Sequence, residues 1–182
     1  KATLVPLDLT EDGKIDELGA ALYKRFGRLD ILVGNAGILG ELTPVNHLDP
    51  KTWDSIIALN VTANYRLIRS MDPLLRASDA GRAIFVTSSA ASAFDPFWGG
   101  YAASKAALEG LVKTYAQEMK HTKICVNLVD PGRQQTTMRA KAFPGEDPNS
   151  LPHPSELTGV FVDLADAQCE HHGEVVSAYR ET

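Results

Sequence analysis

Residues 30–37 read Asp-Ile-Leu-Val-Gly-Asn-Ala-Gly, a short apolar run that ends in small residues able to form a tight turn. This pattern predicts a buried strand that leads into a turn. The pattern returns at residues 83–89 (Ala-Ile-Phe-Val-Thr-Ser-Ser) and at residues 126–132 (Val-Asn-Leu-Val-Asp-Pro-Gly). Because open α/β sheets bind ligands at the carboxyl ends of their strands, the polar residues and glycines that end each run mark a candidate site.

Segments with helical periodicity separate these strands. Strands are predicted at 3–7, 29–33, 83–87, 123–129 and 174–178, and helices at 12–26, 50–76, 100–119 and 155–166. Asp49 is the expected cap of the long second helix, with Pro50 in its first turn. The alternation of strands and helices predicts an α/β fold, a doubly wound parallel sheet with helices on both faces. Residues 133–153, rich in glycine, proline and charge, are expected to form a mobile lid.

The composition narrows the classes of function. The 182 residues suit one domain, and a net charge of −5 without any basic run argues against a nucleic-acid surface. No apolar run approaches the roughly 20 residues that span a bilayer, so no membrane partner is expected. Cys125 and Cys169 lack metal-ligand spacing, and His171-His172 lacks a second ligand pair, so no metal site is expected. Unpaired thiols favour a reducing cytoplasm.

Tyr101 and Lys105 form the first candidate catalytic pair. They stand four positions apart in a predicted helix and therefore share one face. Lowering the pKa of a tyrosine from about 10 to about 7 takes roughly 4 kcal/mol, and a cation at ~4 Å supplies about that much at an effective dielectric constant of ~20. Burial opposes this effect because it disfavours the phenolate. Since a bare Tyr-x-x-x-Lys pair is common on helix surfaces, the surrounding motifs decide its meaning.

Further motifs surround this pair in a fixed order. They are Asn35-Ala36-Gly37, Asn60, Ser88, Tyr101 with Lys105, and Pro131-Gly132 with Thr136. Over essentially the whole chain, this order and spacing resembles the classical short-chain dehydrogenase/reductase family. The resemblance implies a Rossmann-like fold and an oxidoreductase that uses NAD or NADP to interconvert a small-molecule alcohol and carbonyl. It also implies a homodimer or homotetramer in which the helices at 50–76 and 100–119 pair across a twofold axis.

The resemblance assigns catalysis to four residues. Tyr101 would be the general acid and base, and Lys105 would lower its pKa and bind the ribose of the nicotinamide. Ser88 would hold the substrate oxygen, with Ser89 as the alternative serine. Asn60 would anchor a water that links Lys105 to solvent.

The resemblance also assigns a cofactor site. Besides Tyr101 and Lys105, it consists of Asp8 and Leu9 beside the adenine, Asn35, Ala36 and Gly37 along the adenosine, and Pro131, Gly132 and Thr136 around the carboxamide. Two positions depart from the family pattern. Gly34 stands where a second asparagine is usual, and we expect a looser turn there. Gln134 stands where a small aliphatic residue often follows Pro-Gly, and it either alters how the carboxamide is held or marks a disordered lid.

The Gly-rich first βαβ unit of the family has no counterpart in this sequence. We therefore expect the domain at 1–182 to be incomplete at its N-terminus, lacking the first two strands. Residues 3–7 would then have no neighbour in the sheet, and the strand at 29–33 would carry an exposed apolar edge. The choice between NAD and NADP would depend on the lacking part.

Three alternatives stay open at this level. The chain could be a non-catalytic NAD(P)-fold binding or scaffold protein, although a scaffold has no need of Asn60, Ser88, Tyr101 and Lys105 together. It could use the tyrosine for epimerisation or dehydration, although such relatives usually carry a larger C-terminal domain. The aromatic loop at 94–98 either lines the substrate pocket or packs at a subunit interface.

Overall fold

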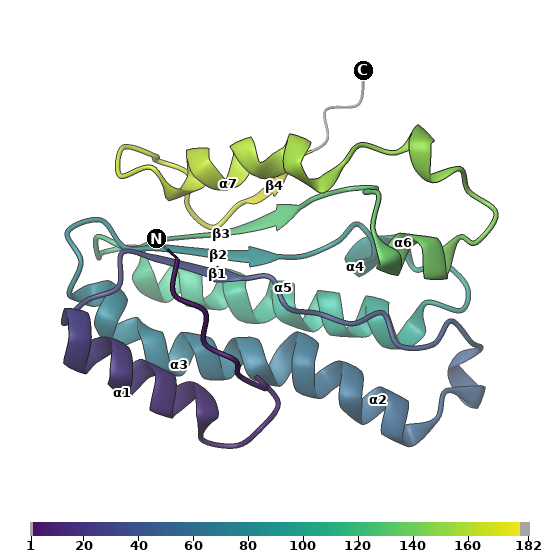
Figure 1. The fold of residues 1–182 in the computed structure, drawn as a ribbon, viewed down its shortest axis with the longest axis horizontal. Helices are drawn as coiled ribbons and strands as arrows, with labels where there is room; N and C mark the ends of the chain where they lie inside the picture. The colour runs from purple at the N-terminus through teal and green to yellow at the C-terminus, as the bar shows by residue number, and fades with distance from the viewer. Residues whose placement is uncertain (1, 179–182) are drawn as a thin grey trace.

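A four-stranded parallel sheet forms the centre of the molecule, as Figure 1 shows for the computed structural model, which describes residues 2–178. Its strands follow one another in the order β1-β2-β3-β4. They are β1 (Ile31–Gly34), β2 (Arg82–Val86), β3 (Cys125–Asp130) and β4 (Val175–Ser177). The strands predicted after residue 28 are confirmed to within two residues at each end, and so is the predicted parallel sheet.

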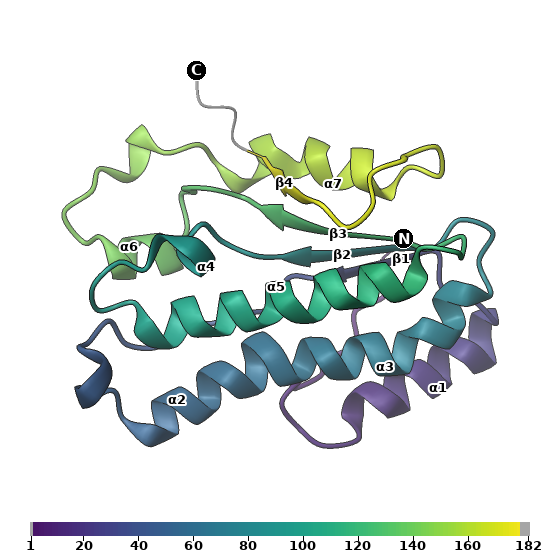
Figure 2. The same cartoon turned by 180° about the vertical axis from the view of Figure 1, so that it is seen from behind.

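Helices cover both faces of this sheet. They are α1 (Lys14–Phe26), α2 (Pro50–Ile57), α3 (Ala63–Arg76), α4 (Ala90–Ala93), α5 (Gly99–Met119), α6 (Thr137–Ala142) and α7 (Thr158–Ala165), with 3₁₀ turns at Val45–His47, Pro148–Ser150 and Pro154–Leu157. Figures 1 and 2 show α3 and α5 on one side of the sheet and α7 on the other, with α1 packed against α3. Within residues 2–178, no helix is both long enough and apolar enough to cross a bilayer.

The core has two unequal parts. The larger part lies between the sheet and helices α3 and α5, and the smaller part, with Ile84, Val129 and Leu164, lies under α7. Every residue of the inner strand β2 is buried. At the edge strand β1, Ile31 and Val33 remain 44% and 45% exposed. The apolar edge that the sequence predicted is therefore confirmed.

The strand predicted at 3–7 is wrong. These residues form no ladder with any described strand, and Leu4 is 91% exposed. Leu7 and Leu9 do pack against the larger core and anchor the segment. The local pattern favoured a strand, but a strand exists only where a neighbour accepts its backbone hydrogen bonds.

The long helix predicted at 50–76 is present but interrupted. Asp49 caps it as expected, because its Oδ2 accepts a hydrogen bond from Thr52 N at 3.0 Å. A π-helical turn at Ala58–Thr62 then separates α2 from α3. Such turns insert an extra residue into a helix and often occur at functional sites. Asn60 lies inside this turn.

The segment at 133–153 is more regular than the predicted lid. It contains α6 and a 3₁₀ turn, and Gln135 N donates to Pro152 O at 3.0 Å. Lys141 Nζ donates to Gly40 O at 3.0 Å and so links α6 to the segment that follows β1. Contacts with residues that are distant in the chain give this stretch a regular structure, although its composition alone indicates a loop.

Gly34 ends β1 opposite Phe85 of β2. A Cβ atom at Gly34 would lie 2.4 Å from Phe85 Cδ1 and 2.5 Å from Asn64 Oδ1. Phe85 is fully buried and fills the space that a side chain at position 34 would need. The departure from the family pattern at Gly34 therefore accompanies a close cross-strand contact.

We expect Gly34→Ala to destabilise the protein by about 1–3 kcal/mol, because overpacking forces buried neighbours to move. Urea denaturation gives the free energy of unfolding. Gly110→Ala is the matched control, since no atom lies within 4 Å of its built Cβ, and it should stabilise helix α5 by about 0.5–1 kcal/mol. The same effect for both variants would contradict this account, and Gly34→Ala combined with Phe85→Leu should recover part of the loss.

Candidate active site

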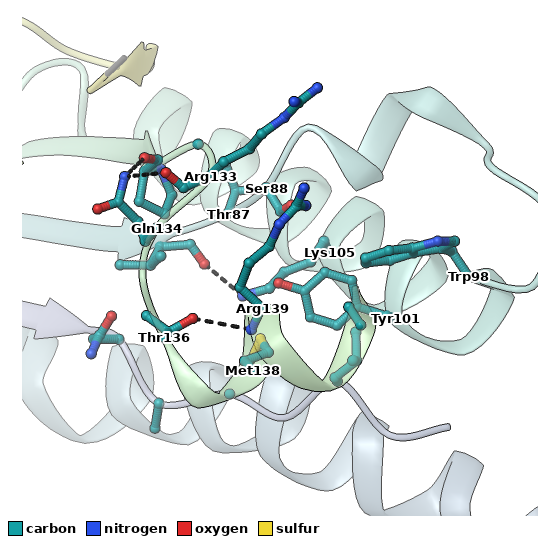
Figure 3. A pocket seen from close by; sticks show the side chains of 18 residues that line it. Thr87, Ser88, Trp98, Tyr101, Lys105, Arg133, Gln134, Thr136, Met138 and Arg139 are labelled. Carbon is teal, nitrogen blue, oxygen red and sulfur yellow. Dashed lines mark hydrogen bonds between the residues drawn. The ribbon is translucent and has the colours of Figure 1, made fainter. Parts of the chain in front are cut away.

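A cavity of about 440 Å³ opens at the carboxyl ends of β1, β2 and β3 (Figure 3). It brings together predicted site residues from all three strand ends and from α5. They are Asn35, Ala36, Gly37, Ser88, Tyr101, Lys105, Pro131, Gly132 and Thr136. Asp8, Leu9 and Asn60 are not part of its lining.

Helix α5 delivers Tyr101 and Lys105 to this cavity from its first two turns. Gly100 allows the helix to approach its neighbours, since a Cβ there would lie 3.0 Å from Ile56 Cδ1 and from Leu48 Cδ2. Tyr101 is 8% and Lys105 is 4% exposed, with Lys105 Nζ 5.6 Å from the centroid of the Tyr101 ring. The expectation that the two side chains share one face and reach one opening is confirmed.

The Lys105 ammonium is held by the backbone of β2. Its Nζ donates a hydrogen bond of 2.8 Å to Val86 O, the last carbonyl of that strand. Burial lowers the pKa of Lys105 to about 8, and the carboxylate of Asp130 opposes this shift. Keeping the cation buried costs free energy, so Lys105 loses its proton at a lower pH than an exposed lysine does.

The phenol of Tyr101 does not show the predicted pKa. Burial raises the pKa of Tyr101 above its ordinary value, the hydrogen bond with the Ser88 side chain lowers it, and the carboxylate of Asp130 raises it further. Lys105 is not among the groups that shift it, so the expectation that one lysine is about sufficient to lower this pKa is wrong. Burial is the largest cause of the shift, and the ammonium of Lys105 is bonded to Val86 O.

The two candidate serines differ in position. Ser88 lines the cavity, and Figure 3 shows its side chain near Tyr101. Ser89 is exposed and stands at the N-cap of α4, where its carbonyl accepts a hydrogen bond from Ala93 N at 3.0 Å. This geometry favours Ser88 for contact with a ligand.

Asn60 lies behind the cavity and is fully buried. Its Nδ2 donates to Ile38 O and to Ser104 Oγ, and its Oδ1 accepts from Ile38 N, each at 2.9 Å. A Cβ at Gly37 would lie 3.3 Å from Asn60 Oδ1 and 3.6 Å from Lys105 Nζ. Asn60 thus ties the π turn to the strand end of β1 and to α5, and its role in holding a water stays a prediction.

Asp8 and Leu9 form a short turn before α1. Asp8 Oδ1 accepts hydrogen bonds from Thr10 N at 2.8 Å and Thr10 Oγ1 at 2.7 Å, while Leu9 packs against the core. Their contact with an adenine ring stays a prediction.

Gln134 is ordered and 7% exposed, so the predicted local disorder is wrong. Its Nε2 donates to Pro131 O and to Arg133 O, both at 2.8 Å, and fixes the turn after β3. Its buried Oε1 has no hydrogen-bond partner among the described residues. A buried acceptor without a donor costs free energy, which the two hydrogen bonds of Nε2 help to offset.

The sequence analysis missed several residues at the mouth of the cavity. Arg133, Met138, Arg139 and Ala142 also line it. Trp98 lines it as well, in agreement with the pocket alternative for the aromatic loop at 94–98. Trp98 packs against Tyr101 and Phe143, with ring centroids 6.0 Å and 5.8 Å apart. The sequence signal that could have predicted them is the group of basic residues after the Pro-Gly turn, in a chain that is acidic overall. Phe94 and Phe97 remain exposed outside the lining, so for them the interface alternative stays open.

Metal-binding side chains form no cluster within residues 2–178. No group of three or more His, Cys, Asp and Glu side chains there could hold a metal ion. His171 pairs with Glu174 at 2.7 Å, and His172 Nε2 lies 2.8 Å from Ala116 O. Cys125 and Cys169 are free thiols.

The model of the family described as short chain dehydrogenase matches residues 1–147. The chain belongs to the short chain dehydrogenase family. Among its curated relatives is the uncharacterized oxidoreductase YciK of Escherichia coli K12, which is 37% identical over 148 residues. These residues cover 81% of this chain but only 58% of the relative, so the chain spans a little over half the length of this relative.

Solved structures of other short chain dehydrogenases have the same fold. One from Salmonella enterica serovar Typhi CT18 superposes with a TM-score of 0.92 at 34% identity, covering 96% of this chain and 73% of that chain. One from Escherichia coli CFT073, complexed with NADPH, has a TM-score of 0.91 at 35% identity, with the same coverage of 96% and 73%. The parallel sheet with flanking helices is therefore that of the family.

The lowered pKa of Lys105 predicts a pH-dependent stability. The unfolded chain holds this proton up to a pKa of about 10.5 and the folded chain only up to about 8, so folding should strengthen as the pH rises from about 8 to about 10.5. The gain is at most about 3 kcal/mol. Urea denaturation of wild type and Lys105→Met across this range should show a stability difference that grows with pH in favour of wild type. Parallel pH profiles would contradict the lowered pKa.

Proposed function

We propose that the protein is an NAD(P)-dependent oxidoreductase that interconverts a small-molecule alcohol and its carbonyl compound. The convergence of Ser88, Tyr101 and Lys105 in one cavity carries this proposal, because a proton donor, a hydroxyl and a cation meet where an α/β sheet binds ligands. Since the chain spans 58% of the length of YciK, the activity is proposed for the whole protein.

The cavity suits a nicotinamide dinucleotide, either NAD or NADP. Asn35 to Gly37 line it from the end of β1, and Pro131, Gly132 and Thr136 line it from the end of β3. Structural relatives from Escherichia coli CFT073 and Shigella flexneri 2a are complexed with NADPH and NADP. When bound, the nicotinamide supplies or accepts the hydride and, in its oxidised form, brings a positive charge.

Tyr101 is proposed as the proton donor in the direction of reduction. The raised pKa of Tyr101 keeps its hydroxyl protonated at neutral pH, which suits a general acid. Ser88 would donate a second hydrogen bond to the same substrate oxygen and hold it within reach of the phenol. In the direction of oxidation Tyr101 must first lose its proton, and the ammonium of Lys105 then stabilises the phenolate.

Assembly and location remain proposals. A homodimer or homotetramer built on the helices at 50–76 and 100–119 and a cytoplasmic location are the arrangements that we propose. The free thiols of Cys125 and Cys169 suit such a reducing compartment.

Replacing Tyr101 with phenylalanine tests the proposal. The variant loses only the hydroxyl, so the turnover number for carbonyl reduction should fall by about 10²–10⁴-fold. A screen of carbonyl compounds with NADH and NADPH, on the full-length protein, measures turnover. Calorimetric titration should find cofactor affinity little changed. Tyr23→Phe, at an exposed position on α1, is the matched control and should keep full activity.

Two outcomes would reject the proposed function. Near-full activity of Tyr101→Phe would remove Tyr101 from the chemistry. Cofactor binding by wild type without turnover of any carbonyl compound would favour the competing hypothesis of a non-catalytic binding protein.

A further inference from the structure

Arg133 is a cation at the cavity that no described residue neutralises by contact. It follows the Pro131-Gly132 turn, is exposed and lines the cavity. Within residues 2–178 its guanidinium makes no ion pair and no hydrogen bond. Figure 3 shows its side chain on the same side of the cavity as Ser88 and directed away from Thr136. In the same view the guanidinium also points away from the Tyr101 ring, so it reaches the rim of the cavity on the Ser88 side.

Arg139, by contrast, is used within the fold. Its Nε and Nη2 bind the two carboxylate oxygens of Glu146 at 2.5 Å and 2.7 Å. Its guanidinium also stacks on the Phe143 ring at 3.6 Å from the centroid, and Phe143 packs against Trp98. Arg139 thus braces the wall of the cavity, and its charge is largely compensated by Glu146.

The charges around the cavity leave a positive surplus. Lys105, Arg133 and Arg139 are the cations of the lining. The carboxylates in electrostatic range are Glu146, whose pKa is lowered by Arg139 and by Arg133, and Asp130, which acts on Tyr101 and Lys105. Glu146 is already bound by Arg139, and Asp130 Oδ1 accepts from Gly132 N at 2.9 Å. Arg133 is the group in which the surplus charge is accessible.

Apolar side chains form part of the same lining. Trp98, Met138 and Ala142 line the cavity, and Leu39 lines it from the segment after β1. An apolar wall with one accessible guanidinium fits a molecule with a hydrocarbon part and one anionic group. Guanidinium binds carboxylate or phosphate oxygens in a bidentate manner, which fixes orientation as well as charge.

We infer that the substrate of this cavity carries an anionic group, carboxylate or phosphate, on an apolar carbon skeleton, and that Arg133 binds this group. The inference rests on the proposed function, because it takes the cavity to be the place where the carbonyl compound lies. Arg133 then sets specificity by orienting the substrate carbonyl toward Ser88 and Tyr101, without taking part in proton transfer.

Calorimetric titration with three probes of equal chain length tests the inference. Hexanoate and hexyl phosphate carry the two anionic groups, and hexanamide is the neutral match. Full-length wild type should bind at least one anionic probe about 10-fold or more tighter than hexanamide, in keeping with a charge-assisted hydrogen bond. Whichever anion binds tighter distinguishes a carboxylate from a phosphate source.

Variants at Arg133 then test whether this side chain causes the preference for anionic probes. Arg133→Gln keeps the length of the side chain and removes its charge, so it should weaken anion binding by roughly 10- to 100-fold and leave hexanamide unchanged. Arg133→Lys should lie between wild type and Arg133→Gln, because it keeps the charge and loses the bidentate fork. Arg25→Gln, at an exposed position on α1, is the matched control and should bind like wild type. Arg133 is exposed, so the fold should tolerate these changes.

Several results would overturn the inference. The first is equal affinity of wild type for the anionic and neutral probes. The second is a preference for anions that survives in Arg133→Gln. The third is a loss of NADPH affinity in Arg133→Gln while its affinity for the anionic probes stays intact. Calorimetry needs no turnover. Arg133-dependent anion binding in a protein without hydride transfer would keep this inference and reject the proposed function, whereas turnover of neutral carbonyl compounds without any anion preference would do the reverse.

Discussion

A buried ammonium bonded to the last carbonyl of a strand organises the centre of this protein. Lys105 reaches from α5 to Val86 O at 2.8 Å, which fixes the helix against the end of β2 and holds a positive charge beside Tyr101 and Ser88. The same bond competes with the phenol for the ammonium. Because burial disfavours both charged forms, the pKa of Tyr101 is raised and the pKa of Lys105 is lowered to about 8. This balance suits the proposed role of Tyr101 as a general acid.

The sequence was a good guide wherever the signal was local. The apolar runs that end in Gly-Asn-Ala-Gly, Thr-Ser-Ser and Asp-Pro-Gly located β1, β2 and β3, and with them the strand ends that form the cavity. The spacing of Tyr101 and Lys105 placed both on one helix face, because helical geometry depends only on neighbours in the chain. The cavity accordingly contains most of the site residues that the sequence predicted.

The misses share a different cause, which is dependence on residues far away in the chain. Residues 3–7 have the composition of a strand and no partner to pair with. The π turn around Asn60 leaves the apolar period almost intact, so periodicity alone gives one long helix. The pKa of Tyr101 depends on burial, on the hydrogen bond with Ser88 and on Asp130, none of which the spacing of Tyr101 and Lys105 can give. Arg133 is the accessible cation of the cavity because Arg139 is already bound to Glu146, and the sequence does not show that pairing.

One exposed hydrogen bond joins helix α6 to the segment that follows β1 at the cavity mouth. Lys141 donates one exposed hydrogen bond to Gly40 O, while Met138, Arg139 and Ala142 of the same helix form part of the cavity wall. An exposed bond of this kind contributes only about 1 kcal/mol net, since water replaces it readily. Breaking this bond therefore costs far less free energy than unfolding the sheet beneath, so the contact between α6 and the segment after β1 can open locally while β1, β2 and β3 stay folded.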